Sequence, residues 1–550
     1  MPAAASSRAR TLLAALRSRR VLALAASVLA LAAAIVVAVA LSQSASTEPP
    51  ATGAAKIVPG DALAYVHIST DARRPAVRSA LRLAGSFPSF PLLGADVLAR
   101  LAGIMSGKAA SGAGALVAFD SDIRPWLGKE AAIAFLNTQG STAGSEIVLG
   151  VRSRPAARAF LLRSGATSAG TYDGVALYRL RTGIETAFVG GYLVLAQPPA
   201  LDSAIAAGTG RIPSLARSRA YDLAAATEPA GRVLDAYFSA AGVSRLLVPQ
   251  KGLVGALGAL LYQPAALGST VSLTPVGGGA RVYVSTALSS RLATGGGARE
   301  FTPTLASELP AGSLLLLDAR GLGRIAPRVL GAGSAAGIAG RLGPLLQRLG
   351  AALAAEGADV RGLETLFGGE SAVAVAPVGT GPPTLIVIAR TADERRARTE
   401  LAGLEGPLAN LFPAPSRGSG VVPEFTTHGI DGVNAHQLSL GPGLSIDYAV
   451  FRGLIVVSTS LRGIGAVARH AGTLAAESAY LKSLPGQPQP VTSLGFLDFN
   501  RLLSLLKSTG LTSGARYQAL RPDLQRIQAV GVQTRRGQAE LSAQIVFKIQ

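Results

Sequence analysis

Cysteine is absent from this sequence of 550 residues. Its absence excludes disulfide bonds, cysteine-ligated zinc, thiol catalysis and a lipidated N-terminal cysteine. It is compatible with an oxidising compartment but is no proof of one. Lysine is scarce too, because only seven of the 52 basic residues are lysine, so arginine is the dominant cation.

Charged residues are also few, at 15% of the chain, whereas 49% of the residues are hydrophobic. A chain of this length and composition can bury more than one core, so we expect folded domains rather than disorder. The net charge of +20 comes from scattered arginines, without a dense patch interleaved with aromatic residues, so we expect no nucleic-acid partner. Attraction to an anionic lipid or cell-wall polymer is compatible with this charge.

Sequence patterns typical of enzyme sites are missing as well. There is no Gly-x-Ser-x-Gly motif for a nucleophilic serine and no Gly-x-x-x-x-Gly-Lys-Ser/Thr loop for phosphates. No ligand spacing typical of a metal site connects the four histidines, which are His67, His428, His436 and His470. We therefore predict no catalytic, cofactor-binding or metal-binding residues and no cofactor. An enzyme with an unrecognised site is the less favoured alternative.

The N-terminal region has the pattern of a membrane anchor. Residues 1–20 contain five arginines and no acidic residue, and residues 21–41 form a run of 21 residues without a charge. At ~1.5 Å per residue, such a helix spans roughly 31 Å, the thickness of the hydrocarbon core of a membrane. The positive-inside rule then predicts a cytoplasmic basic N-terminus, one transmembrane helix and an extracytoplasmic body at the cell membrane.

The competing interpretation of this region is a cleaved signal peptide. Ala38-Val39-Ala40 has the small-x-small form of a cleavage site. The apolar run is longer than a typical signal core, which favours an uncleaved signal-anchor. Both interpretations export the rest of the chain, and residues 42–56, with Pro49-Pro50 and small polar residues, are predicted to be a linker.

The chain after the predicted linker contains an internal sequence repeat. Residues 172–175 (Tyr-Asp-Gly-Val) and 430–433 (Ile-Asp-Gly-Val) each precede a run of strand-like segments, and Asp-Gly between apolar runs is typical of a hairpin turn. Each copy therefore predicts a three-stranded antiparallel meander. Residues 146–152 likewise match residues 384–390, and the offset stays near roughly 260 residues up to a closing hairpin, which indicates internal repeats.

These observations predict an α+β fold of two tandem homologous domains, with largely antiparallel sheets and packed helices, after one N-terminal transmembrane helix. The first repeat covers residues 57–290 and the second covers residues 307–550. The linker at residues 291–306 contains Gly-Gly-Gly and Thr-Pro. The pattern leaves open whether the two repeats share one sheet or enclose a cavity.

Two kinds of acidic residue recur in both copies. Asp173 and Asp431 lie in the Asp-Gly turns, and Glu130 and Glu370 stand at strand starts. Paired acids can serve catalysis, but recurrence at turns favours a structural role, with the aspartates forming hairpins and the glutamates bonding a local amide. Trp126, the only tryptophan, is interpreted as a core or hinge anchor.

Apolar helical segments raise a second functional hypothesis. Leucine and isoleucine side chains form a helical stripe over residues 338–353, and residues 253–261 form a shorter apolar segment. Packing on the protein's own sheets explains both stripes. A groove for an apolar ligand such as lipid is the alternative.

The chain resembles a bacterial family catalogued as domain of unknown function 3352, which is common in actinobacteria. The resemblance rests on Asp-Ile-Arg-Pro-Trp-Leu-Gly at residues 122–128, Pro-Gly-Asp-Ala-Leu-Ala-Tyr-Val at residues 59–66 and Phe-Val-Gly-Gly-Tyr-Leu-Val-Leu at residues 188–195. It covers nearly everything after the membrane helix, and only the first copy carries the Pro-Trp form. It implies a single N-terminal anchor and no activity, because the family has no assigned catalytic or binding residues.

We therefore predict a single-pass membrane-anchored extracytoplasmic protein of the cell envelope, with a non-catalytic binding or structural role. The expected partners, besides the membrane itself, are an envelope protein, a lipid or an anionic cell-wall polymer. The alternative is a carrier or sensor of an apolar ligand.

Overall fold

The computed structural model describes residues 49–90, 99, 101, 103–105, 119–136, 144–250, 252–289, 299–321, 366–377, 383–410, 424–441, 444–508, 512 and 514–550. The predicted membrane helix (residues 21–41) and the apolar stripe (residues 338–353) lie outside this part of the chain. Among the described helices, none has both the length and the apolar character needed to span a membrane.

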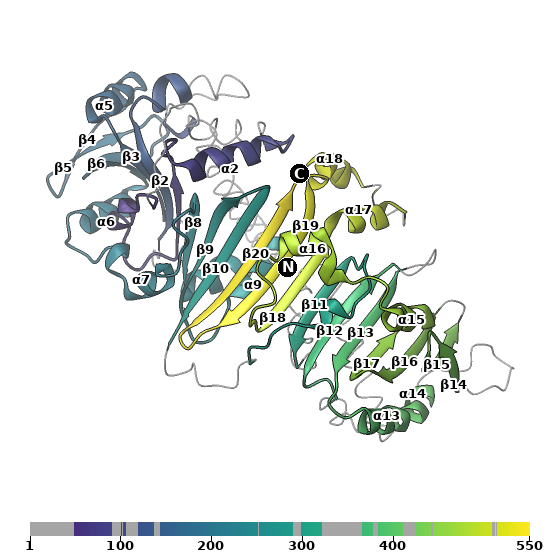
Figure 1. The fold of residues 1–550 in the computed structure, drawn as a ribbon. Coiled ribbons are helices and arrows are strands. Elements are labelled where there is room, and N and C mark those ends of the chain that lie inside the picture. Colours follow the sequence, from purple (N-terminus) through teal and green to yellow (C-terminus); the bar gives the residue numbers. More distant parts are fainter. Residues whose placement is uncertain are drawn as a thin grey trace, which may run out of the picture. The chain divides into compact units, whose positions relative to one another are not determined.

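The chain divides into two compact units (Figure 1). Unit 1 comprises residues 1–250 and 261–289, and unit 2 comprises residues 251–260 and 290–550. Every strand pairing described below is antiparallel, so each unit is an α+β structure on an antiparallel sheet, as predicted.

The sheet of unit 1 has the strand order β4-β5-β6-β7-β3-β2-β1-β8-β9-β10. Its strands are β1 (Ala64–Ser69), β2 (Leu127–Phe135), β3 (Ser145–Val151), β4 (Thr167–Tyr172), β5 (Val175–Arg179), β6 (Glu185–Val189), β7 (Tyr192–Ala196), β8 (Leu234–Ser239), β9 (Ala266–Val276) and β10 (Gly279–Leu288). Its helical segments are η1 (Gly53–Lys56), α2 (Pro75–Gly85), η2 (Phe119–Ile123), α5 (Arg154–Arg163), α6 (Pro198–Gly208), η3 (Leu215–Arg217), α7 (Arg219–Ala225), α8 (Ala240–Gly242) and η4 (Val243–Leu247), and α9 (Gly252–Leu261) follows them in the chain.

The sheet of unit 2 has the strand order β14-β15-β16-β17-β13-β12-β11-β18-β19-β20. Its strands are β11 (Leu315–Arg320), β12 (Glu370–Ala376), β13 (Thr384–Arg390), β14 (Phe425–Ile430), β15 (Val433–Gly441), β16 (Leu444–Phe451), β17 (Leu454–Ser458), β18 (Ser493–Asp498), β19 (Ile527–Arg536) and β20 (Glu540–Ile549). Its helical segments are η5 (Leu305–Ser307), α13 (Glu394–Gly403), α14 (Glu405–Asn410), α15 (Leu461–Arg469), η7 (Leu474–Ala476), α16 (Ser478–Ser483), α17 (Phe499–Ser508) and α18 (Ala515–Leu524).

The two strand orders are the same when the strands are read in chain order within each unit. In both units a four-stranded meander is joined to the sheet through the strand that precedes it (β3 or β13). In both units the sheet then closes with a long hairpin, β9–β10 or β19–β20.

The Asp-Gly turns form as their sequence predicts. Asp173 and Gly174 have φ angles of 54° and 76°, and Asp431 and Gly432 have φ angles of 48° and 81°. Two consecutive positive φ angles match the right-handed twist of a hairpin, and Asp-Gly tolerates them well. Each meander has four strands, whereas the sequence predicted three. The prediction missed β4 and β14, which precede the Asp-Gly turns and pair across them with β5 and β15.

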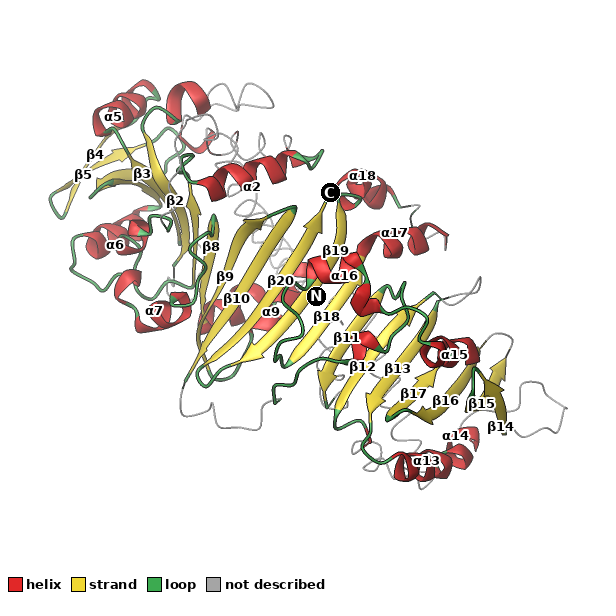
Figure 2. Ribbon diagram, viewed as in Figure 1, coloured by secondary structure: helices red, strands yellow, loops and turns green. Residues whose placement is uncertain are grey.

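Each sheet is covered on both faces. In unit 1, Ile133 of β2 packs in the core that includes Phe160 of α5, whereas the neighbouring Ala132 packs in the core that includes Leu201 of α6. Successive side chains point to opposite faces of a strand, so both helices bury sheet surface (Figure 2). Every residue of β1 is consequently buried.

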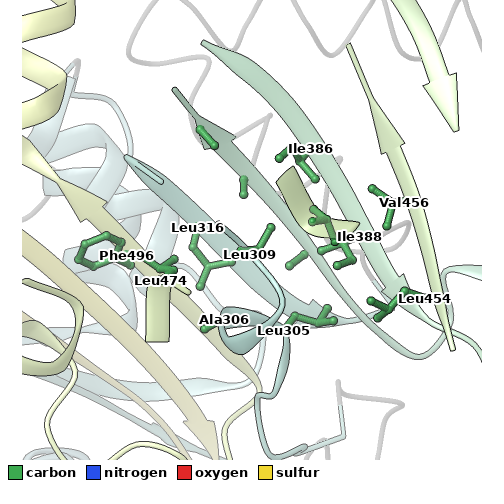
Figure 3. Packing of buried hydrophobic residues seen from close by; sticks show 14 of the residues in the cluster. Leu305, Ala306, Leu309, Leu316, Ile386, Ile388, Leu454, Val456, Leu474 and Phe496 are labelled. Atoms are coloured by element: carbon green, nitrogen blue, oxygen red, sulfur yellow. The ribbon is translucent and has the colours of Figure 1, made fainter. Parts of the chain in front are cut away.

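Unit 2 repeats this arrangement. Leu401 of α13 packs on one face of its sheet, and Val467 of α15 packs on the other. Figure 3 shows the second of these cores, which contains Leu316 of β11, Ile388 of β13 and Leu454 of β17. Burial of apolar side chains on both faces makes the central strands the stable part of each unit.

Candidate functional site

A buried charged cluster lies on the central strands of unit 1. His67 of β1 is fully buried, and its register partner on β8 is Asp235. The Nδ1 atom of His67 lies 2.9 Å from Oδ1 of Asp235, and its Nε2 atom lies 3.5 Å from Oε2 of Glu130 on β2. One imidazole therefore stands between two buried carboxyl groups.

The cluster continues toward the loop that precedes β8. The Nε atom of Arg232 lies 3.0 Å from Oδ1 of Asp235 and 3.1 Å from Oε2 of Glu228. All three side chains are at most 11% exposed. Two cations, if His67 is protonated, thus face three carboxyl groups in a region that water barely reaches.

The pKa values of the cluster follow from this competition between burial and charge. Burial lowers the pKa of His67, but the charge of Asp235 and the contacts with both carboxylates outweigh it and raise the pKa to about 9. Burial raises the pKa of Asp235, but the charges of His67 and Arg232 bring it below its ordinary value. Burial, and then the charge of Asp235, raise the pKa of Glu228 to about 8. At neutral pH the imidazole is a cation between two carboxylates, and Glu228 is mostly protonated.

Glu130 joins this cluster to the start of the domain. Its Oε2 atom accepts a hydrogen bond from the Ala54 amide at 3.1 Å, and its Oε1 atom accepts one from the Tyr192 hydroxyl at 2.6 Å. Burial raises the pKa of Glu130, but the neighbouring His67 and the hydrogen bond from Tyr192 outweigh burial, so this pKa lies below its ordinary value. The prediction that this glutamate binds a local amide is wrong, because its amide partner lies 76 residues earlier in the chain.

Glu370 also accepts hydrogen bonds from a distant backbone segment in unit 2. It accepts hydrogen bonds from the amides of Thr304 and Leu305, the latter at 2.9 Å, and from the Thr304 hydroxyl at 2.6 Å. Both glutamates thus anchor a short 3-10 helix, η1 or η5, against the start of a strand. The recurrence seen in the sequence therefore reflects a structural role for these two residues.

The strand register aligns the two units residue by residue. His67 pairs with Ala132, and Asp318 pairs with Ala372, so a histidine in unit 1 takes the position of an aspartate in unit 2. Asp318 is 1% exposed. Burial, and then the charge of Glu370, raise its pKa to about 8, so this carboxyl group is mostly neutral at pH 7.

The cation of unit 2 stands on the other side of the glutamate. The Nε atom of Arg390 lies 4.0 Å from Oε2 of Glu370 and donates to the Thr304 hydroxyl at 3.1 Å, while its Nη2 atom lies 3.0 Å from Oε1 of Glu308. The register pairs Arg390 with Leu454. The matching pair in unit 1 is Gly150 with Tyr192.

The position of Arg390 is therefore occupied by a glycine in unit 1. The match of residues 146–152 with residues 384–390 is wrong by two residues, because the register places Gly150, and not Arg152, at the position of Arg390. Three residues of β2 (128–130) lie opposite Gly150 alone, which makes a bulge. A Cβ atom on Gly128 would lie 2.8 Å from the carbonyl carbon of Gly150. Two glycines thus let the two backbones meet where unit 2 carries an arginine side chain.

A pocket of about 790 Å³ opens at this position in unit 1. Glu130 and Tyr192 line it, so the hydrogen bond between them forms part of its wall. The other lining residues are Ala51, Thr70, Asp71, Ala72, Arg73, Arg124, Leu127, Gly128, Lys129, Gly150, Val151, Arg152 and Gly191.

The remaining candidates from the sequence lie elsewhere. Trp126 is 1% exposed and packs beside Phe160, which makes it a core residue. Its indole Nε1 atom donates to the carbonyl oxygen of Asp122 at 2.7 Å. Asp173 forms an ion pair with Arg211.

The other three histidines form no site with His67. His428 and His436 lie on paired strands, where His428 contacts the Thr426 hydroxyl and His436 contacts Glu405. His470 lies near Glu308. Within the described residues, no group of three or more potential metal ligands comes together.

Sequence reasoning missed the connection of His67 with Asp235 and the pocket beside Glu130. A signal for the first was present, because both residues are charged or ionisable positions inside otherwise apolar strands. No local signal marks the pocket, because it depends on a register shift between two strands.

Two α+β units, each built on an antiparallel sheet and one of them with a buried charged cluster beside a pocket, define the class of protein. The chain belongs to the family described as "Protein of unknown function (DUF3352)", whose model matches residues 22–547. The resemblance noted from the sequence is thereby confirmed. A search of curated proteins finds no match.

Some solved structures are distantly similar. Crystal form I of TP0453 is 12% identical, with 43% of this chain and 79% of that chain covered and a TM-score of 0.26. Crystal form III of TP0453 is 12% identical, with 44% and 80% covered and a TM-score of 0.23. Likenesses at these TM-scores support no inference about fold or function.

Proposed function

We propose that this protein is a single-pass, membrane-anchored, extracytoplasmic binding module of the cell envelope, without catalytic activity, and that the pocket of unit 1 is its binding site. The family and the α+β sheets are the established part of this description. The anchor at residues 21–41 and the location rest on the charge and hydropathy of the sequence.

We further propose that the two units are copies of one duplicated domain. The identical strand order supports this, as do Glu130 and Glu370, which hold equivalent 3-10 helices.

The observation that carries the binding proposal is the contrast between Arg390 and Gly150. In unit 2 the arginine guanidinium lies 4.0 Å from Glu370 and donates to the Thr304 hydroxyl that also binds this glutamate. In unit 1 the equivalent position has no side chain, the backbone of Glu130 lies against it, and Gly150 lines the pocket. Ligand sites are typically preformed concave regions with a few fixed polar groups, which this pocket provides.

The absence of catalysis is supported by the way the acidic groups are used. Glu130 is held by a backbone amide and a tyrosine hydroxyl, and Asp235 is held by His67 and Arg232. A general base needs a lone pair directed at substrate, whereas these carboxylates already satisfy structural partners. The apolar-carrier alternative depends on residues 338–353, outside the described part, and on residues 253–261, which lie in α9 (Gly252–Leu261), and it stays a prediction.

The test uses purified cell-wall sacculi and the full chain in detergent. Gly191 lines the pocket, and a Cβ atom there would meet nothing within 4 Å, so Gly191→Phe adds bulk to the pocket without a backbone clash. Gly277, in the β9–β10 turn, has the same open surroundings, and Gly277→Phe is the matched control.

We expect the wild type and Gly277→Phe to sediment with the sacculi and Gly191→Phe to stay in solution. Fluorescence of Trp126, the only tryptophan, checks that each variant is folded. Equal sedimentation of all three proteins would remove the pocket from the function.

Location is tested separately, and the lack of native cysteine makes the test clean. A membrane-impermeant maleimide should label Ala216→Cys, which is exposed in unit 1, in intact cells that express the full chain. It should label Ser7→Cys only after the cells are permeabilised. Protection of Ala216→Cys in intact cells would contradict an extracytoplasmic body.

A further inference from the structure

The charges around the pocket of unit 1 indicate what it binds. Four basic side chains line it, namely Arg73, Arg124, Lys129 and Arg152, against two acidic ones, Asp71 and Glu130. Formal charge alone therefore leaves the lining positive. Whether that charge is available depends on how each group is engaged.

Two of the four cations are already paired. The Nε atom of Arg73 lies 3.2 Å from Oδ1 of Asp71, and Nη1 of Arg124 lies 3.2 Å from Oδ1 of Asp120. Exposed pairs of this kind contribute little and exchange readily. These arginines can therefore turn toward a ligand, but they do not define the charge of the pocket.

The other two cations, Arg152 and Lys129, are not neutralised by an acidic side chain among the described residues. Arg152 donates from Nη2 to the carbonyl oxygen of Pro125 at 2.8 Å, which is a neutral partner. Lys129 has no ion-pair partner within the part of the chain that the structure describes, and both side chains are exposed. Lys129 belongs to the bulged residues of β2, and bulges commonly redirect a side chain at a functional site.

The one buried carboxylate in the wall does not cancel this charge. Glu130 is compensated from inside by His67, whose Nε2 atom lies 3.5 Å from Oε2, and by the hydroxyl of Tyr192. In unit 2 the compensating cation, Arg390, is on the outer side. In unit 1 the cation next to Glu130 is the buried His67, so no cation corresponding to Arg390 neutralises this glutamate from the pocket. The rim of the pocket is basic.

We propose that the pocket of unit 1 binds a phosphate or carboxylate group of an anionic cell-wall polymer, with Lys129 and Arg152 as its charged partners. This inference rests on the proposed function, which supplies the location and the binding site but no ligand chemistry. Arginine suits oxyanions because its planar donors match two oxygens, and lysine adds a mobile point charge.

The first experiment titrates the full chain in detergent with inorganic phosphate and with glycerol 3-phosphate, and with glycerol as the uncharged control. We expect both anions to bind and glycerol not to bind. Lys129→Gln and Arg152→Gln should each weaken anion binding about five- to tenfold, as expected for loss of one charge-assisted hydrogen bond. Arg217→Gln, an exposed arginine of unit 1 outside the pocket, should bind as the wild type does.

The second experiment separates this inference from the proposed function. Phosphate should release the wild type from sacculi, and sacculi stripped of phosphate polymers by hydrogen fluoride should bind it less. If Gly191→Phe loses sacculus binding while phosphate and the charge variants have no effect, the pocket binds something neutral and the anion inference is overturned alone.

A lipid source of the anion is a third outcome. Water-soluble dihexanoylphosphatidylglycerol is titrated beside glycerol 3-phosphate. Binding that requires the acyl chains and is absent for sacculi would overturn the polymer assignment in favour of an anionic lipid. Equal binding of the two compounds supports recognition of the phosphate group itself.

Discussion

His67 and Asp318 occupy the same ladder position in the two units, yet one is a buried cation and the other a buried, mostly neutral acid. Each stands beside the equivalent glutamate, Glu130 or Glu370. The glutamate is compensated in both units, by His67 from within in one and by Arg390 from outside in the other.

Replacement of His67 should destabilise unit 1 strongly. His67→Gln keeps the volume roughly but leaves Glu130 without a cation and Asp235 with Arg232 alone, and loss of one partner of a buried ion pair costs about 3–5 kcal/mol. The free energy of unfolding from urea titration, followed by Trp126 fluorescence, reports this unit. Arg217→Gln, at an exposed position of the same unit, should change the stability by less than about 0.5 kcal/mol, and an equal loss in both variants would contradict the charge argument.

The pH dependence of unit 1 should carry the signature of the same histidine. The pKa of His67 is raised from 6.5 to about 9, so its contribution to stability is complete below pH 6.5 and is lost as pH rises through 9. A shift of this size corresponds to about 3 kcal/mol, since the group is fully buried. Urea titrations from pH 6 to 10 should show the loss in the wild type and a flatter profile in His67→Gln. A wild-type profile as flat as that of the variant would show that His67 does not cause the pH dependence.

Gly53 and Tyr192 should be energetically coupled. A Cβ atom on Gly53 would lie 2.2 Å from the Tyr192 hydroxyl, so Gly53→Ala should cost about 1–3 kcal/mol through overpacking. Tyr192→Phe removes that oxygen and leaves the ring carbon Cζ at 3.4 Å. The double variant should therefore recover most of the cost of Gly53→Ala, and additive losses in a double-mutant cycle would disprove the contact.

Glu146 offers a stabilising change. It is fully buried on β3, burial alone raises its pKa, and neither carboxyl oxygen has a hydrogen-bond partner among the described residues. A carboxyl group whose pKa is raised on folding destabilises the folded protein as pH rises above the pKa of the unfolded state, near 4.5. Glu146→Gln should therefore unfold at higher urea than the wild type at pH 7 and at nearly the same urea at pH 4. A variant no more stable at pH 7 would show that the carboxylate is not strained by burial.

Turn chemistry and core burial could be predicted because they are local. Asp173 and Asp431 lie in the hairpins that Asp-Gly predicts, and Trp126 is a buried core residue, as predicted. The strands β4 and β14 were missed for a physical reason. Both are edge strands with mostly exposed side chains, so the alternation that marks a half-buried strand is absent from their sequences.

The site itself depends on long-range register and could not be predicted. His67 and Asp235 are 168 residues apart in the chain, and Glu130 meets an amide 76 residues before it. Gly150 reveals its importance only when the bulge of β2 is placed opposite it. A two-residue slip in the comparison of the copies hides the exchange of arginine for glycine.

The same glutamate position is neutralised by a buried cation in unit 1 and by a more exposed cation in unit 2. Either position can therefore hold the cation, and the two can exchange during evolution. A homologue with a basic side chain at the position of Gly150 no longer needs a charged residue at the position of His67, and a homologue that loses its arginine at the position of Arg390 needs a new cation behind Glu370. These positions should therefore change together across the family, and the pairs that break the rule would mark members whose pocket has been reshaped.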